Sequence, residues 1–230
     1  MIHMTKPSPS CAIAALLFAA IAAVTAPTVG FAQSPTQSSA RAQSDLAAIA
    51  KAKRDSVRRP YTAADVHFMS GMIGHHAQAI VMAGWAPSHG AGPAVRTLCE
   101  RIINAQTDEI ATMQQWLRDR QLPVPEASAA GMKMVMDGVE HTMLMPGMLS
   151  EEQMKQLDSA RGKEFDKLFL TFMIQHHRGA VQMVQDLFDS YGAAQDDLVF
   201  KFASDVQVDQ RTEIARMQRM IVAINFGIEQ

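Results

Sequence analysis

An internal repeat constrains the fold of this chain more than any other sequence feature. The segment from Asp65 to Met82 aligns without a gap with the segment from Asp166 to Met183, and a second match follows each copy, Gln106 to Gln114 with Gln210 to Gln218. The repeat predicts a helix, a turn and a second helix in each half. One such hairpin leaves an apolar face uncovered, whereas two can close a four-helix bundle around one seam.

Capping and helix-breaking residues predict where the helices begin and end. Thr62 and Ser150 are N-cap residues, Ser150 forms a capping box with Gln153, and Pro93 suits a first helical position. These signals predict helices over 62–85, 93–122, 150–162, 164–190 and 196–226. The all-α bundle domain is expected over 61–226, with one hairpin over 61–122 and the other over 150–226. A Met-rich connection over 123–149 is expected to be a long loop, because no window there shows strand alternation with hairpin turn signals.

The N-terminal segment has the features of an export signal. Lys6 precedes an apolar run from Cys11 to Val24, and Gly30-Phe31-Ala32 is a small-x-small cleavage site. We expect residues 1–32 to be a signal peptide and the mature protein to be periplasmic or secreted, without stable membrane insertion. An uncleaved anchor is the alternative. Residues 33–60 are expected to be a tether followed by a short basic helix over 44–59. The mature chain retains one cysteine, Cys99, which we expect to be a buried thiol.

Paired histidines with a methionine one turn earlier recur in both copies. Met72 stands three and four residues before His75 and His76, so one turn of helix carries a thioether and two imidazoles. Met82 lies two turns from His75 and suits a neighbouring site. Core packing is the alternative role, but the duplication favours metal or proton chemistry, since buried imidazoles without partners cost free energy. The bundle residues expected to bind metal are Met72, His75, His76, Met82, Met173, His176, His177 and Met183.

The connection between the hairpins is crowded with thioethers. A loop can fold its sulfur atoms around a soft ion, or it can form an apolar lid over the bundle, and the two roles are compatible. Thioether sulfur favours Cu(I), while imidazole accepts Cu(I), Cu(II) and zinc. Copper is therefore the expected metal, with Cu(I) favoured and Cu(II) also accommodated. The residues of the connection expected to contribute are Met132, Met134, Met136, His141, Met143, Met145 and Met148.

Several other kinds of site are excluded or disfavoured. A formal charge of -2 gives no reason to expect a nucleic-acid partner. A di-iron site of the ferritin kind needs a glutamate three residues before a histidine, and Met or Ile stands there in both copies. Glu109 and Glu213 are matched between the repeats, but we expect them to occupy ordinary solvated or hydrogen-bonding helix positions, because Glu is rarely buried unpaired. No Cys-x-x-Cys-His motif for covalent haem is present.

The doubled motif Phe-x-x-x-Met-Ile-x-His-His-x-x-Ala-(Ile/Val)-x-Met, with a Met-Pro-Gly-Met segment between the copies, resembles the domain-of-unknown-function family 305 (DUF305). The resemblance covers about Tyr61 to Ile221. It implies a ferritin-like helical bundle without the standard iron ligands. Some relatives are periplasmic copper-binding proteins linked to copper tolerance, which use Met and His ligands. By resemblance, that role falls on the Met and His residues of the two motif helices.

The leading hypothesis is an exported copper-binding protein that buffers the metal or confers tolerance to it, without substrate turnover. A copper-handling protein is a candidate partner. One alternative is a redox protein that holds non-covalent haem or another redox metal in the bundle. Another is a structural helical domain whose Met-rich segment docks a partner protein. Metal content and a haem Soret band would discriminate among the three.

Overall fold

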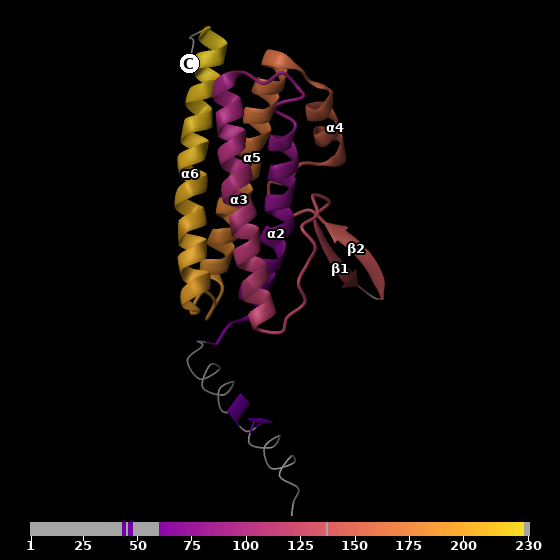
Figure 1. The fold of residues 1–230 in the computed structure, drawn as a ribbon, viewed down its shortest axis with the longest axis vertical. Coiled ribbons are helices and arrows are strands. Elements are labelled where there is room, and N and C mark those ends of the chain that lie inside the picture. Colours follow the sequence, from indigo (N-terminus) through magenta and orange to yellow (C-terminus); the bar gives the residue numbers. More distant parts are fainter. Residues whose placement is uncertain (1–42, 45, 48–59, 137, 228–230) are drawn as a thin grey trace, which may run out of the picture. The chain divides into compact units, whose positions relative to one another are not determined.

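A computed structural model describes residues 43–44, 46–47, 60–136 and 138–227 of the 230-residue chain. The expected signal peptide, most of the tether and most of the expected helix over 44–59 lie outside these residues. The helical domain is shown in Figure 1. Its elements are α2 (Ala63–Gly84), α3 (Pro93–Asp119), β1 (Met132–Met136), β2 (Val139–Met143), α4 (Glu151–Ser159), α5 (Gly162–Asp189) and α6 (Asp197–Phe226).

The helix ends follow the capping residues of the sequence. Thr62 and Asp65 form a capping box at the start of α2, and Ser150 and Gln153 form another at the start of α4. Pro93 opens α3, where its missing N–H would have had no partner within the helix. The Asp196 side chain accepts from the backbone N–H groups of the first turn of α6. The five helices predicted between residues 62 and 226 are therefore present, with ends shifted by a few residues.

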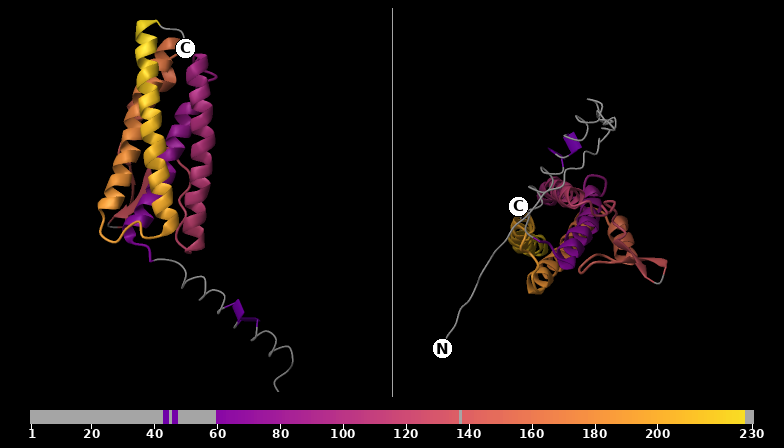
Figure 2. Two further views of the ribbon diagram at one scale, coloured as in Figure 1. Left: turned by 90° about the vertical axis from the view of Figure 1, so that its left-hand side faces the viewer. Right: turned by 90° about the horizontal axis from the view of Figure 1, so that it is seen from below.

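The four long helices form two antiparallel pairs, α2 with α3 and α5 with α6, and α2 also packs against α5 (Figures 1 and 2). Phe68, near the start of α2, shares an apolar core with Leu187, near the end of α5. Met82, near the end of α2, shares a second core with Phe165, near the start of α5. The two motif helices therefore run antiparallel, and their midpoints meet. Across the described parts of the chain, no helix is both long and apolar enough to span a membrane.

A reciprocal pair of aspartates ties the two hairpins together. Asp65 of the first hairpin accepts the backbone N–H of Ala194 at 2.7 Å, in the turn of the second hairpin. Asp166 of the second hairpin accepts the backbone N–H of Gly92 at 3.1 and 3.2 Å, in the turn of the first. Both aspartates are buried. These matched repeat positions therefore satisfy buried donors on the opposite hairpin, which fixes the register of the two halves.

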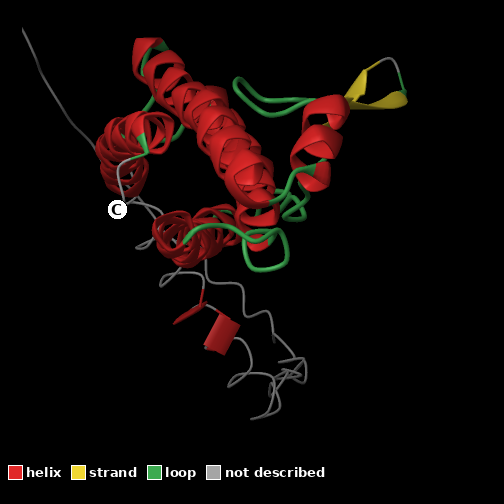
Figure 3. Ribbon diagram, turned by 90° about the horizontal axis from the view of Figure 1, so that it is seen from above, coloured by secondary structure: helices red, strands yellow, loops and turns green. Residues whose placement is uncertain are grey.

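The expectation of a strand-free connection is wrong. Met132–Met136 and Val139–Met143 pair as an antiparallel hairpin, with Met136 opposite Val139. A two-residue link remains between the strands, and its Gly138 has a φ of 78°. The sequence Asp137-Gly138 is a strong hairpin signal, because tight two-residue turns need positive φ. Alternation of Met with Lys and Val before this pair was the signal that the loop interpretation overlooked. Seen from above, the hairpin and α4 lie on one side of the long helices (Figure 3).

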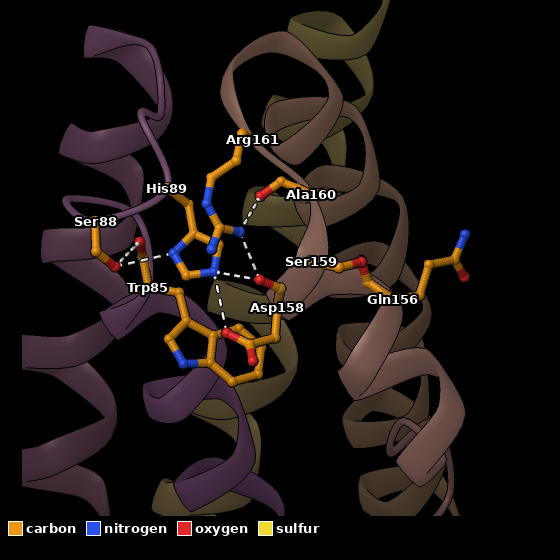
Figure 4. A network of polar contacts seen from close by, with 8 residues as sticks. All are labelled: Trp85, Ser88, His89, Gln156, Asp158, Ser159, Ala160 and Arg161. Carbon is orange, nitrogen blue, oxygen red and sulfur yellow. Dashed lines mark hydrogen bonds and ion pairs between the residues drawn. The ribbon is translucent and has the colours of Figure 1, made fainter.

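A buried histidine anchors α4 against the turn between α2 and α3 (Figure 4). The Nε2 atom of His89 lies 2.8 Å from the carbonyl oxygen of Asp158 and 3.1 Å from its carboxylate. Its Nδ1 atom lies 2.9 Å from Ser88 Oγ. The indole of Trp85 stacks on the ring, with 5.8 Å between centroids. Both ring nitrogens therefore have partners, so His89 is a satisfied structural residue.

Glycines let the connection cross the motif helices closely. A Cβ atom on Gly179 would lie 1.9 Å from the carbonyl oxygen of Pro146 and 2.6 Å from Gly147 Cα. A Cβ on Gly71 would meet the end of the Met145 side chain, at 2.7 Å from its Cε atom. The first contact joins two backbones, which cannot rotate away, whereas the second involves a flexible side chain. Gly179 is therefore the stricter requirement.

Replacing Gly179 with Ala should destabilise the fold by roughly 2–4 kcal/mol, because the connection must move off α5. Gly84→Ala is the matched control, since nothing lies within 4 Å of the Cβ it would add. Helix propensity predicts that this control is neutral or stabilising by up to about 1 kcal/mol. Urea unfolding followed by circular dichroism measures both. Equal stabilities of the two variants would contradict the close crossing.

Candidate metal centre

Four buried imidazoles meet where α2 crosses α5. His75, His76, His176 and His177 are each 0% exposed. The ring centroids of His75 and His176, which come from different hairpins, are 3.8 Å apart with an interplanar angle of 38°. The two apolar cores lie on either side of this layer along the bundle. The antiparallel crossing of the repeated helices thus brings both His-His pairs into one water-excluded layer.

One nitrogen of each of three rings is engaged with an acceptor. His75 Nε2 lies 3.0 Å from the carbonyl oxygen of Pro146, and His176 Nε2 lies 3.0 Å from the carbonyl oxygen of His75. His177 Nε2 lies 2.7 Å from Glu213 Oε2. A carbonyl oxygen can only accept, so in the first two rings Nε2 must carry the hydrogen. In each neutral ring, the lone pair is therefore on Nδ1.

These Nδ1 atoms have no partner among the residues that the structure describes. All four histidines have a buried Nδ1 atom without a hydrogen bond. A buried acceptor without a partner costs about 1–3 kcal/mol, so four in one layer call for an explanation. A lone pair on neutral imidazole is the form in which histidine binds metal ions. The donor chemistry of the layer therefore fits a soft or borderline metal.

Two glutamates from the outer helices contact the same layer. Glu213 of α6 accepts from His177, and Glu109 Oε2 of α3 lies 2.7 Å from His76 Nε2, although outside hydrogen-bonding geometry. Their side chains are 16% and 21% exposed. The expectation that they occupy ordinary helix positions overlooked this contact. A carboxylate on Nε2 fixes the tautomer of a histidine and raises the basicity of Nδ1, as in carboxylate–histidine–metal arrangements.

Buried glutamines accompany the glutamates one turn earlier. Gln106 and Gln210 are 2% and 4% exposed, and their Oε1 atoms have no hydrogen bond within the described part of the chain. Both line a cleft of about 160 Å³ between α3 and α6, together with Glu109 and Glu213. Sequence reasoning did not select these glutamines. The signal was available as a Gln-x-x-Glu pattern that both repeats share.

Burial keeps three of the imidazoles neutral, those of His75, His176 and His177. Desolvation, followed by the neighbouring His76, lowers the pKa of His75 to about 3. Desolvation and His75 lower the pKa of His176 in the same way. Desolvation also lowers the pKa of His177, although Glu213 opposes it. Neutral rings retain the lone pair that a metal ion needs.

The methionines of the motif helices lie in the cores beside the histidine layer. Met72 and Met183 belong to one core, and Met82 and Met173 belong to the other. The antiparallel crossing thus pairs each methionine with one from the opposite repeat. Cys99 lies in the second core, and burial raises the pKa of its thiol to about 12. The expectation of a buried thiol is confirmed.

The residues of the connection that were predicted to bind metal do not all lie in one place in the structure. Met145 and Met148 are each 5% exposed and belong to the first core, against which Met132 also packs. His141 and Met143 are exposed on β2. Met134 pairs with His141 in the strand register, and Met136 ends β1. The connection therefore supplies two buried thioethers near the histidine layer, while its β-hairpin contacts the first core through Met132 and exposes His141 and Met143.

The histidine layer is not a preformed metal-binding site of the common kind. Among the residues with described positions, no three His, Cys, Asp or Glu side chains are grouped so as to hold a metal ion. A metal in this layer would therefore need a combination of imidazole and thioether donors.

The fold and this layer define a duplicated helical-hairpin protein with a paired-histidine centre. The chain belongs to the DUF305 family, a domain of unknown function, whose model matches residues 65–221. The recognition made from the doubled motif is therefore confirmed. No functionally curated protein matches the chain.

Solved structures of the family share the fold. A DUF305 protein from Streptomyces coelicolor is 28% identical with a TM-score of 0.59, over 70% of this chain and 94% of that one. A DUF305 fragment from Deinococcus radiodurans is 27% identical with a TM-score of 0.58, over 71% and 98%. CopM in its Cu(I)-bound form is 26% identical with a TM-score of 0.53, over 73% and 99%. CopM has also been solved in Cu(II)-bound and Ag-bound forms.

The lowered pKa values of His75, His176 and His177 predict a pH-dependent stability. Below the ordinary pKa of 6.5, the unfolded chain binds protons on these histidines that the folded protein does not, so the free energy of unfolding falls as pH falls from 6.5 toward 3. Each such histidine contributes up to about 1.4 kcal/mol per pH unit. Urea titrations of metal-free protein between pH 7.5 and 5 measure the slope. His75→Gln should have a shallower slope than the parent, and equal slopes would argue against a neutral buried ring.

Proposed function

We propose that this protein binds copper in the histidine layer of the bundle and acts as an exported metal-buffering or tolerance protein without catalysis. The observation that carries the proposal is the set of four buried Nδ1 atoms that find no hydrogen-bond partner among the described residues. In His75, His176 and His177 the acceptor on Nε2 leaves the lone pair on Nδ1, and a metal ion can bind such a lone pair. The Cu(I), Cu(II) and Ag forms of CopM, a relative of similar fold, support copper as that ion.

The surrounding donors favour the reduced ion. Imidazole nitrogen binds either oxidation state of copper, whereas thioether sulfur favours Cu(I). Met72 and Met173 precede the paired histidines by one turn, and both are 0% exposed. Cu(I) is satisfied by two or three ligands, so it suits a layer without a ready cage. Cu(II) is accommodated less well, because it prefers four or more donors in a tetragonal array.

The glutamates act as positioning residues in this proposal. Glu213 holds the Nε2–H of His177, so Nδ1 presents its lone pair to the metal. Glu109 faces His76 in the matching position. The carboxylates also offset part of the positive charge that copper brings into a buried layer.

Export belongs to the same proposal. The apolar run and small-x-small site before Gln33 support secretion. The Streptomyces coelicolor relative is inferred to be secreted, which agrees with this. A ferritin-like type for the four-helix arrangement, and a copper-handling partner protein, remain predictions.

Replacing His75, His76, His176 and His177 together with Gln should weaken Cu(I) binding by orders of magnitude, since each replacement removes an imidazole but keeps a polar group. Anaerobic titration against a competing Cu(I) chelator near pH 7 gives the affinity. His89→Gln is the matched control, because it removes a buried histidine whose nitrogens already have partners. Circular dichroism checks the helicity of each variant. A folded quadruple variant with parental affinity would overturn the centre, and a Soret band in purified protein would favour haem instead.

We expect the β-hairpin of the connection to contribute less to Cu(I) binding than the histidine layer. Replacing Met132, Met134 and Met136 with Leu keeps apolar bulk but removes thioethers. We expect a smaller loss of Cu(I) affinity than in the histidine variant and little change for Cu(II), because thioether favours the reduced ion. The same chelator competition measures both ions. A larger loss than in the histidine variant would move the principal site to the hairpin.

A further inference from the structure

The histidine layer has no exposed surface, so a metal ion must reach it through other groups. All four rings are 0% exposed, and apolar cores lie on both sides. A fully hydrated ion cannot cross an apolar core at low cost, because each lost water must be replaced by a donor. A path therefore needs donor atoms between solvent and the layer.

One surface pocket offers soft donors on the way to His75. It has a volume of about 120 Å³ and lies between α2, α5 and the connection. Met145 of the connection and Met183 of α5 contribute thioethers to its wall, each 5% exposed. His67 of α2 lines it and is exposed to solvent. The carboxylate-bearing Asp186 lies at the same pocket and favours a cation there.

Helix spacing connects this pocket to the centre. His67, Gly71 and His75 are each four residues apart on α2, so they form one stripe with about 6 Å of rise per step. Met145 covers the middle of the stripe, because its Sδ atom lies 3.2 Å from where a Cβ of Gly71 would be. The thioether thus stands between the exposed imidazole and the buried one.

The inner wall of the pocket touches the centre directly. Pro146, the residue after Met145, lines the pocket, and its carbonyl oxygen lies 3.0 Å from His75 Nε2. The neighbouring thioether of Met148 is already engaged, because its Sδ atom lies 3.3 Å from the backbone N of Met145. Met145 is therefore the thioether placed to exchange a metal between the surface and the layer.

Resting on the copper-binding function proposed above, we propose that His67, Met145 and Met183 form a separate uptake pocket that first captures Cu(I) and passes it to His75. Two thioethers and one imidazole suit Cu(I) and Ag(I), and disfavour hard divalent cations. The transfer is a ligand exchange without change of oxidation state. The ion first leaves His67 while the Met145 thioether holds it, and the Met145 side chain then releases it to His75. This role adds His67 to the residues that handle the metal.

The test separates the rate of loading from the affinity. Cu(I) is transferred anaerobically from a chromophoric chelator to the full mature chain, by stopped flow for the rate and at equilibrium for the affinity. His67→Gln removes an exposed donor, so the fold should not change. We expect its loading rate to fall several-fold while the equilibrium affinity stays close to that of the parent. His67→Met, which restores a soft donor, should recover most of the rate.

A second variant examines the middle of the path. Gly71→Ala adds a Cβ that would lie 2.7 Å from the Met145 Cε atom, so the thioether must move off the stripe. It should also load slowly, and its helicity is checked by circular dichroism. Parental loading rates in both His67→Gln and Gly71→Ala would overturn the uptake pocket while leaving the copper centre intact. A parent protein that takes up no Cu(I) would instead refute the proposed function, and the pocket with it.

Discussion

The crossing of α2 and α5 at their midpoints is the contact on which the rest of the structure depends. There His176 reaches across to the backbone carbonyl of His75, with 3.0 Å between nitrogen and oxygen. Because the two helices are repeats of one another and run antiparallel, whatever stands at the midpoint appears twice in one layer. The same geometry places the apolar residues before the histidines of one copy beside those after the histidines of the other. A duplicated polar motif is thereby enclosed by two apolar cores.

Burial between the two apolar cores determines the chemistry of the histidine layer. Desolvation disfavours the charged forms of His75, His176 and His177, so these rings are neutral at physiological pH and keep a lone pair. Leaving three such acceptors without hydrogen bonds to the described residues costs free energy that a purely structural core would avoid by using apolar residues. His89, in the turn between α2 and α3, shows the contrast, since both of its nitrogens have partners. Two buried histidine environments in one domain thus differ in whether the described residues satisfy both ring nitrogens.

Much of the fold could be predicted because its signals are local. Thr62, Pro93 and Ser150 act on the turn that follows them, so their helix starts were predictable without tertiary information. The repeat placed the paired histidines in one bundle. The hairpin was missed because a run of methionines was interpreted as flexible, although Asp137-Gly138 favours a tight turn. The carbonyl of Pro146 gave no signal at all, since every residue carries one and only the tertiary path decides which meets His75. The glutamates carried a signal, the shared Gln-x-x-Glu, which the general exposure of Glu outweighed.

The two repeats differ at positions 78 and 179, which are equivalent in the repeat. Gln78 in the first copy hydrogen-bonds both backbone groups of Leu149 and so holds the connection, whereas its counterpart Gly179 has no side chain and lets Pro146 and Gly147 pass against the helix. In a symmetric dimer of identical hairpins, the same position could not be glutamine in one copy and glycine in the other. Joining them in one chain removed that constraint and allowed each copy to change alone. The likeness of the halves is therefore expected to persist where they face each other and to fade where the connection runs.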